Sequence, residues 1–211
     1  MTAAKMTVTK IESLGKKRYL IKSGNTPLFV LYGQELKSYG LEEEKEISRE
    51  CYGEILESVL KKRALLRCLH LLERKDYTEW QLRQKLREGY YPDEVADLTM
   101  EDLKGYGYLD DSRYAERYME YKLKSKSLRA VITDLKQKGI SRDIIDSAME
   151  HFDYEKTRED QRNTIVKLLT KRHYYDNAGD PKEKARQYRF LAGKGYDAGD
   201  IKSALDLDMN L

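Results

Sequence analysis

Residues that impose covalent links or break a helix are scarce in this sequence. Its 211 residues include two cysteines, three prolines, three phenylalanines and one tryptophan. Cys51 and Cys68 lack a C-x-x-C spacing, so neither a disulfide framework nor a zinc site is indicated, and reduced thiols are expected. With 36% charged residues and so few prolines, the composition predicts a helix-rich protein with long charged faces.

Long apolar runs are also missing. Residues 1–7 contain no apolar segment of the kind that a signal peptide needs, and no later run approaches the length that crosses a bilayer. The sequence therefore predicts a cytoplasmic protein without membrane contact, and we expect a monomer.

Neither sign of charge is in large excess. The 40 basic and 37 acidic residues leave a net charge of +3. This sum is too small to indicate a nucleic-acid binder by itself, so any such inference depends on where the charges lie.

Residues 1–46 are predicted to form a small antiparallel β-meander. Apolar and β-branched runs between residues 8 and 32 are separated by Gly15-Lys16-Lys17 and by Ser23-Gly24-Asn25, which are typical turn sequences. One or two helical turns are expected over residues 34–39, and the acidic run 42–46 is expected to be a solvated connector.

From residue 47 onward, apolar residues recur at helical spacing. Ser48 is a natural N-cap for a connecting helix over residues 47–60, and a separate helix is expected to follow it. Thr78 and Gln81 match a capping box, which marks the start of the next helix. Pro92, expected at a first helical position, predicts another helix that ends near residue 105.

The helical part of the sequence repeats. Residues 86–95 align with residues 135–144 at an offset of 49, and residues 191–196 continue the series. Each copy ends a helix, turns at or beside a glycine, places an apolar residue and restarts a helix, although the glycine of the first copy falls one place early. The predicted fold class is mainly α, with an elongated curved array of three tandem three-helix repeats at residues 61–109, 110–152 and 153–211.

Residues 105–115 join the first two repeats. Their glycines can end one helix, and Asp110 can cap the next by accepting a backbone N–H, with Asp111 where the helix dipole favours negative charge. The loop residues Tyr108 and Leu109 are expected to be buried between the helices that they join. The predicted structural motif consists of Gly107, Tyr108, Leu109, Asp110, Asp111, Tyr114 and, at the end of a later helix, Gly139.

Basic residues recur in blocks. The block over residues 61–87 faces few acids, residues 91–116 are strongly acidic, and further basic blocks cover residues 117–138 and 162–189. Solvated helix faces with local ion pairs would explain any single residue, whereas the recurrence suggests a stripe for a polyanion or an acidic protein surface. The candidate contact residues are Arg83, Arg87, Arg117, Lys122, Lys124, Lys126, Arg129, Lys136, Lys138, Arg172 and Arg186.

No catalytic, cofactor-binding or metal site is predicted. Gly105-x-Gly107 lacks the third glycine of a dinucleotide fingerprint, and helix capping explains Asp110 and Asp111 better than metal ligation does. The three histidines lack metal or triad spacing. The tyrosines, Tyr121 among them, are expected to pack half-buried on helices rather than to stack on bases.

Residues 107–115, followed by a basic stretch to Arg129 and by residues 135–140, resemble the signature of the bacterial regulatory protein RecX family. The helix start at Thr78 is similar to that family's Ser-x-x-Glu-Leu type start. The resemblance covers roughly residues 60–207, and the N-terminal meander resembles the extension of longer members. Two features depart from the family pattern: Lys126-Ser127-Leu128 stands where Gly-Pro is common, and Tyr114 replaces the usual Phe.

The resemblance implies a non-enzymatic modulator of the recombinase RecA, with repeats that lie in the helical groove of the RecA–DNA filament. Family members usually suppress ATP hydrolysis, strand exchange and coprotease activity, which places them in recombination regulation, DNA repair and the SOS response. Weak, sequence-independent contact with DNA is compatible with this function. The residues alone leave two alternatives, a direct DNA-binding regulator with a helix-turn-helix-like unit and a purely structural helical scaffold.

Overall fold

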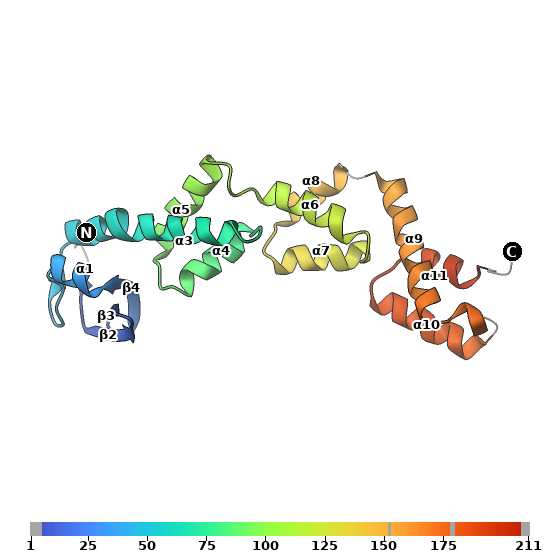
Figure 1. Ribbon diagram of the computed structural model, residues 1–211, viewed down its shortest axis with the longest axis horizontal. Coiled ribbons are helices and arrows are strands. Elements are labelled where there is room, and N and C mark those ends of the chain that lie inside the picture. Colours follow the sequence, from blue (N-terminus) through green and yellow to red (C-terminus); the bar gives the residue numbers. More distant parts are fainter. Residues whose placement is uncertain (1–5, 152, 178–179, 208–211) are drawn as a thin grey trace. The chain divides into compact units, whose positions relative to one another are not determined.

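The computed structural model describes residues 6–151, 153–177 and 180–207. It divides into two compact units, Met1–Asp110 and Asp111–Leu211 (Figure 1). The first unit combines the β-strands with the helices up to α5, and the second contains the helices from α6 to α11. We describe each unit by itself.

The predicted β-meander is confirmed as a three-stranded antiparallel sheet in the order β2-β3-β4. Pairing places Ile21 opposite both Ile11 and Phe29, and Ile21 and Phe29 are fully buried. The acidic run is not entirely a solvated connector, because its last residue lies in a second, two-stranded sheet. The strands are β2 Lys10–Gly15, β3 Arg18–Ser23 and β4 Thr26–Tyr32, with β1 Met6–Thr7 paired to β5 Glu46–Ile47.

A long helix follows the sheets and the short α1 (Gly33–Ser38). It runs without a break through α2 (Arg49–Glu54), a π-helical segment (Ile55–Lys61) and α3 (Lys62–Leu72). The expected division into two helices near residue 60 is therefore wrong. Residues 55–63 contain no proline and no glycine, and a single serine is their one residue of an N-cap type. Nothing in the sequence therefore stops the helix there.

The long helix and the three-stranded sheet share one hydrophobic core. Ile55 and Leu60 on the helix belong to the same buried cluster as Phe29 on β4. Arg63 adds polar contacts at the edge of this core: its guanidinium donates to the Val30 carbonyl at 3.0 Å and pairs with Glu35 at 2.5 Å. The sheet is therefore fixed to the helix by apolar packing and a hydrogen bond, and the ion pair joins α1 to the same helix.

The capping box predicted at Thr78 is confirmed. The Gln81 N–H donates to the Thr78 hydroxyl at 3.3 Å, and the Thr78 N–H donates to the Gln81 side chain at 3.2 Å. It starts α4 (Glu79–Arg87), which packs with α5 (Asp93–Gly105), and α5 in turn packs on the long helix. Pro92 is the N-cap of α5 and not its first helical residue, a difference of one position.

The second unit begins with the three helices of the second repeat, α6 (Asp111–Lys122), α7 (Leu128–Gln137) and α8 (Arg142–Glu150). Serine hydroxyls cap two of them, since Ser127 accepts from the Ala130 N–H and Ser141 from the Ile144 N–H. The core of this repeat is a separate buried cluster that comprises Ala115, Met119, Leu123, Val131, Leu135, Ile140, Ile145 and Ala148.

The third repeat consists of α9 (Tyr154–Lys171), α10 (Pro181–Gly193) and α11 (Ala198–Leu205), with a short 3₁₀ turn at Tyr175–Asn177. Its own core includes Tyr174, whose hydroxyl donates to the Leu205 carbonyl at 2.9 Å. The mainly α fold with three tandem three-helix repeats and an N-terminal antiparallel sheet is thus confirmed (Figure 1).

The same helix-ending turn recurs in all three repeats. Each turn closes with a backbone N–H that returns to the carbonyl of a fully buried leucine five residues earlier, in the pairs Tyr91 to Leu86, Ile140 to Leu135 and Tyr196 to Leu191. The residue before each N–H donor is left-handed, with φ of +58° at Tyr90, +82° at Gly139 and +83° at Gly195. The sequence repeat is therefore a repeat of one backbone turn.

Tyr90 takes this conformation without being glycine, and we predict that Tyr90→Gly stabilises the first unit by about 0.5–1 kcal/mol. A left-handed φ costs a residue with a side chain about 1–2 kcal/mol, and glycine removes this cost. Part of the gain is lost because glycine raises the conformational entropy of the unfolded chain. Urea unfolding followed by the fluorescence of Trp80, the sole tryptophan, measures this unit directly. Gly89→Ala is the matched control. It should destabilise, because its new Cβ would lie 2.9 Å from the Tyr91 ring. A destabilised Tyr90→Gly would show that ring packing outweighs the backbone strain.

Candidate functional site

Two lysines and an aspartate surround Tyr118 on the second repeat. The Tyr118 hydroxyl donates to Asp134 Oδ2 at 2.9 Å, and Lys126 Nζ donates to the same oxygen at 2.6 Å. The hydrogen bond from Lys126 holds the pKa of Asp134 below its usual range, while burial raises that of Tyr118. Lys138 Nζ lies 5.3 Å from the Tyr118 ring centroid. Lys126 and Lys138 therefore contribute to the packing of α6 on α7.

Tyrosines extend this cluster along α6. Tyr114 stacks on Tyr118 with ring centroids 5.9 Å apart, as expected for half-buried helix packing. Tyr121 differs, because it is 68% exposed, and the expectation of half-buried packing is wrong for this residue. Lys122 Nζ lies 4.9 Å from the Tyr121 ring centroid. The end of α6 thus presents an aromatic ring and an ammonium group together.

Three of the candidate cations on the second repeat are exposed and have no ion pair within the described part of the chain. They are Lys124 in the loop after α6, and Arg129 and Lys136 on α7. Arg129 and Lys136 are seven residues apart, so both project from one side of α7 about 10 Å apart along its axis. Arg117 is exposed on α6. These four candidate side chains lie where a partner can reach them.

The two candidate basic residues of the first repeat, Arg83 and Arg87, both pair with acidic side chains. Arg83 pairs with Glu79 at 2.7 Å and with Asp97 at 2.5 Å, and Arg87 pairs with Asp93 at 3.2 Å. The expectation that the block faces few acids is therefore wrong for these two residues. Acids of α5 that are distant in sequence lie beside α4, which a linear count of charges does not reveal.

The candidate residues of the third repeat also contact their own repeat. Arg172 donates to the Gln187 side chain at 2.7 Å, and its guanidinium lies 4.0 Å from the Phe190 ring centroid. Arg186 pairs with Glu183 at 2.9 Å. The Arg172 contacts hold the end of α9 against α10, whereas the Arg186 pair lies within α10, so both arginines already have partners in their own repeat.

Gln161 of α9 joins the third repeat to the second. Its amide nitrogen donates to the carbonyls of Leu123 at 3.1 Å and Lys126 at 2.9 Å, and its amide oxygen accepts from the Leu128 N–H at 3.0 Å. The two carbonyls belong to the turn after α6, and the N–H belongs to the first turn of α7. One side chain therefore supplies hydrogen-bond partners for backbone groups at the end of α6 and at the start of α7. Sequence reasoning missed this residue, although a polar side chain in line with the apolar positions 165 and 169 was a signal.

A second contact between these repeats lies beside the first. The Ser127 hydroxyl donates to the Lys194 carbonyl at 2.6 Å while it caps α7. Gly195 lies so close that an added Cβ would be 3.1 Å from both Ser127 Oγ and Arg129 Cβ. The loop Lys126-Ser127-Leu128 is therefore the loop that docks on the third repeat.

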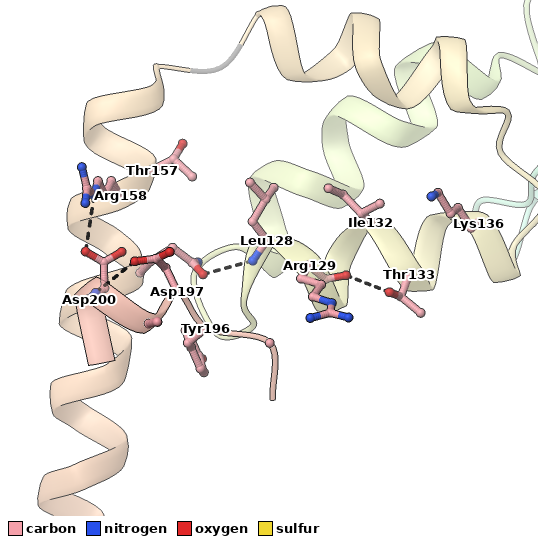
Figure 2. A pocket seen from close by; sticks show the side chains of 13 residues that line it. Leu128, Arg129, Ile132, Thr133, Lys136, Thr157, Arg158, Tyr196, Asp197 and Asp200 are labelled. Atoms are coloured by element: carbon pink, nitrogen blue, oxygen red, sulfur yellow. Dashed lines mark hydrogen bonds and ion pairs between the residues drawn. The ribbon is translucent and has the colours of Figure 1, made fainter. Parts of the chain in front are cut away.

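A cavity of about 690 Å³ opens between α7, α9 and the turn before α11 (Figure 2). Arg129, Ile132 and Lys136 line it from α7, and Arg158 and Asp200 line it from the third repeat. Arg158 and Asp200 form an ion pair, shown by a dashed line in Figure 2. The pocket combines apolar, cationic and anionic groups on walls that the Gln161 and Ser127 contacts hold in place.

At the joint between the first two repeats, the structure agrees with the prediction at most positions. Gly107 is left-handed with φ of +74°, Leu109 is 3% exposed, and α6 begins at Asp111, which leaves Asp110 at the N-cap position. Tyr108 is 57% exposed, so its predicted burial is wrong. Of the two loop residues, Leu109 is therefore buried in the core of the first unit, and Tyr108 is exposed.

Residues that could supply other chemistry are dispersed. No three acidic, histidine or cysteine side chains of residues 6–151, 153–177 and 180–207 gather closely enough to hold a metal ion. Burial raises the pKa of the Cys68 thiol to about 11, which keeps it protonated. No helix within these ranges is long and apolar enough to cross a membrane.

The fold and the charges define a class of protein, namely tandem three-helix repeats that follow a small β-sheet and present cations on the middle repeat. Three family models match the chain in order: the first three-helix domain of RecX at residues 64–103, the second at 110–149 and the third at 159–205. The chain belongs to the RecX family of regulatory proteins.

Relatives span most of the chain. The regulatory protein RecX of Clostridium botulinum strain Alaska E43 is 27% identical over 213 residues, which cover 98% of this chain and 97% of that protein. That of Clostridium perfringens strain 13 is 31% identical over 151 residues, with 68% and 69% coverage. A crystal structure of a regulatory protein RecX has a TM-score of 0.64 at 24% identity and covers 95% of this chain and 100% of that chain, which supports the fold.

Proposed function

We propose that this protein is a non-enzymatic regulator that binds the RecA recombinase on its DNA filament and inhibits its ATPase, strand-exchange and coprotease activities. Membership of a regulatory family with three matched domains supports the proposal. The observation that carries it is a set of exposed cations on the middle repeat, Lys124, Arg129 and Lys136, that form no ion pair with the residues that the structure describes. The protein acts as a monomer in the cytoplasm and contacts DNA only weakly and without sequence preference.

Electrostatics explains how these cations serve a filament binder. A nucleoprotein filament is a repeating anionic surface, and exposed ammonium and guanidinium groups accelerate association with it and fix the register of the bound protein. Cations that are already paired, such as Arg83 and Arg186, add little to such a contact. We therefore assign the main electrostatic contact to the second repeat.

The proposal is tested by measuring ATP hydrolysis by RecA on single-stranded DNA with and without this protein. We expect hydrolysis to decrease as the protein is added, together with sedimentation of the protein with the filaments. An unchanged rate without cosedimentation would contradict the proposal. Specific binding to one duplex sequence in the absence of RecA would instead favour a direct DNA-binding regulator.

We expect charge reversal at the three cations to weaken filament binding by at least about tenfold. The variant combines Lys124→Glu, Arg129→Glu and Lys136→Glu. All three side chains are exposed, so the helical circular dichroism should stay unchanged. The matched control reverses three exposed lysines elsewhere, Lys37, Lys167 and Lys202, and should change binding much less. Equal losses in both variants would mean that net charge, and not this site, controls binding.

A further inference from the structure

The cavity between the second and third repeats has two walls of different charge. On the α7 wall, Arg129 and Lys136 make no ion pair with any described residue. On the opposite wall, Asp200 is buried and accepts from Arg158 at 3.3 Å and from Arg162 at 2.8 Å, while Asp197 accepts the Gly199 and Asp200 N–H groups at the start of α11. One wall is therefore an unsatisfied cationic surface, and the other carries carboxylates that already have partners.

Apolar side chains lie between these walls. Leu128 and Ile132 of α7 are half-buried and line the cavity together with Tyr196 from the third repeat (Figure 2). A cavity of about 690 Å³ is large enough for a few side chains of a partner. Thr133 and Thr157 also line it, and Thr133 is exposed.

The geometry of the cavity is set before any partner binds. Gln161 lines it and makes three hydrogen bonds to the second repeat, and Gly195 lines it where the backbone of the third repeat approaches Ser127 and Arg129. A site on two helices that are locked together needs little ordering when it binds, which favours affinity.

We propose that this cavity, called here the inter-repeat groove, binds an acidic segment of the filament's protein chain that inserts one apolar side chain. The apolar side chain would pack on Leu128 and Ile132, and a neighbouring carboxylate would pair with Arg129 and Lys136. The inference rests on the proposed function and deepens it by naming the groove and the chemistry of the segment. A DNA backbone fits less well, because phosphates would leave the apolar surface of Leu128, Ile132 and Tyr196 between the walls uncovered.

A photocrosslinking residue in place of Thr133 tests this groove directly. Benzoylphenylalanine at this position would be illuminated in the presence of RecA filaments on single-stranded DNA, and the crosslinked product would be identified by mass spectrometry. Thr170 on α9 is the matched control, since it too is an exposed threonine whose hydroxyl donates to the carbonyl four residues earlier. We expect a crosslink from residue 133, and not from residue 170, to a protein segment that contains Asp or Glu beside an apolar residue.

Charge reversal supplies a second measurement. Arg129→Glu with Lys136→Glu should lower the filament affinity by about tenfold, whereas Lys167→Glu with Lys202→Glu should leave it within about twofold. A crosslink from residue 133 to DNA would overturn the inference in favour of a nucleic-acid groove. If the wild-type protein inhibits RecA, no crosslink forms and the two double variants bind equally well, the proposed role of the groove is overturned and the proposed function stands. A wild-type protein that neither binds nor inhibits the filament would remove both the groove and the proposed function.

Discussion

Replacing Gln161 by leucine is expected to destabilise the second unit by about 2–4 kcal/mol. The amide makes three hydrogen bonds to the backbone at Leu123, Lys126 and Leu128, and the side chain is only 8% exposed. Leucine has a similar size but can neither donate nor accept, so two carbonyls and one N–H would lose their partner in a place that water reaches poorly. The second and third repeats should then unfold at lower denaturant concentration.

Two spectroscopic signals separate this effect from a general loss of stability. Circular dichroism reports the helices of both units, whereas fluorescence reports Trp80 of the first unit alone. In Gln161→Leu the dichroism should show an earlier transition while the Trp80 midpoint stays in place. Asn163→Leu removes an exposed amide from the same helix and should change stability by no more than about 0.5 kcal/mol. Identical curves for both variants would show that the three bonds contribute nothing net.

Gly195→Ala is expected to cost about 1–3 kcal/mol, because it combines left-handed strain with a steric conflict. Gly195 has φ of +83°, and its added Cβ would lie 3.1 Å from Ser127 Oγ and 3.1 Å from Arg129 Cβ. Relief of this conflict requires α7 and the third repeat to separate slightly. The variant should therefore also weaken the Ser127 hydrogen bond to Lys194 and change the shape of the inter-repeat groove.

Gly193→Ala, two residues earlier, is the control for this substitution. Gly193 ends α10 with ordinary backbone geometry and open space around its Cα, so alanine should be neutral or stabilising by up to about 1 kcal/mol. Thermal unfolding of both variants, followed by circular dichroism, compares the two positions. If Gly195→Ala proves as stable as Gly193→Ala, the contact between repeats is more adaptable than its geometry indicates.

Local signals in the sequence predicted much of this fold. The Thr78 capping box, the Ser48 cap and the turn residues of the meander each depend on a few neighbouring positions, and each is present in the structure. The fusion of α2 and α3 into one helix was missed because apolar stripes on both sides of residue 60 resemble two helices. The structure resolves this with a π-helical segment, which shifts the phase of the stripe without ending the helix.

The site was predicted less well, since it depends on contacts between residues distant in sequence. The pairing of Arg83 with Asp97 and of Lys126 with Asp134 requires two helices to meet, and a charge count along the chain cannot show it. Gln161 and Asp200 were missed for the same reason, because each is significant only through its partners in another helix. What the sequence did predict was the basic character of the second repeat, including Arg129 and Lys136.

The unbroken helix from Arg49 to Leu72 affects how this protein can be divided. The matched first RecX domain begins at residue 64, inside that helix and after its π-helical segment. A fragment cut there would lose the half-helix that carries Ile55 and Leu60, and it would expose the apolar groups that now pack against them. Arg63, which pairs with Glu35 of α1, would be removed as well. The smallest intact folding piece around the first repeat therefore includes the β-sheet, and the N-terminal extension is part of the first repeat's core rather than an appendage to it.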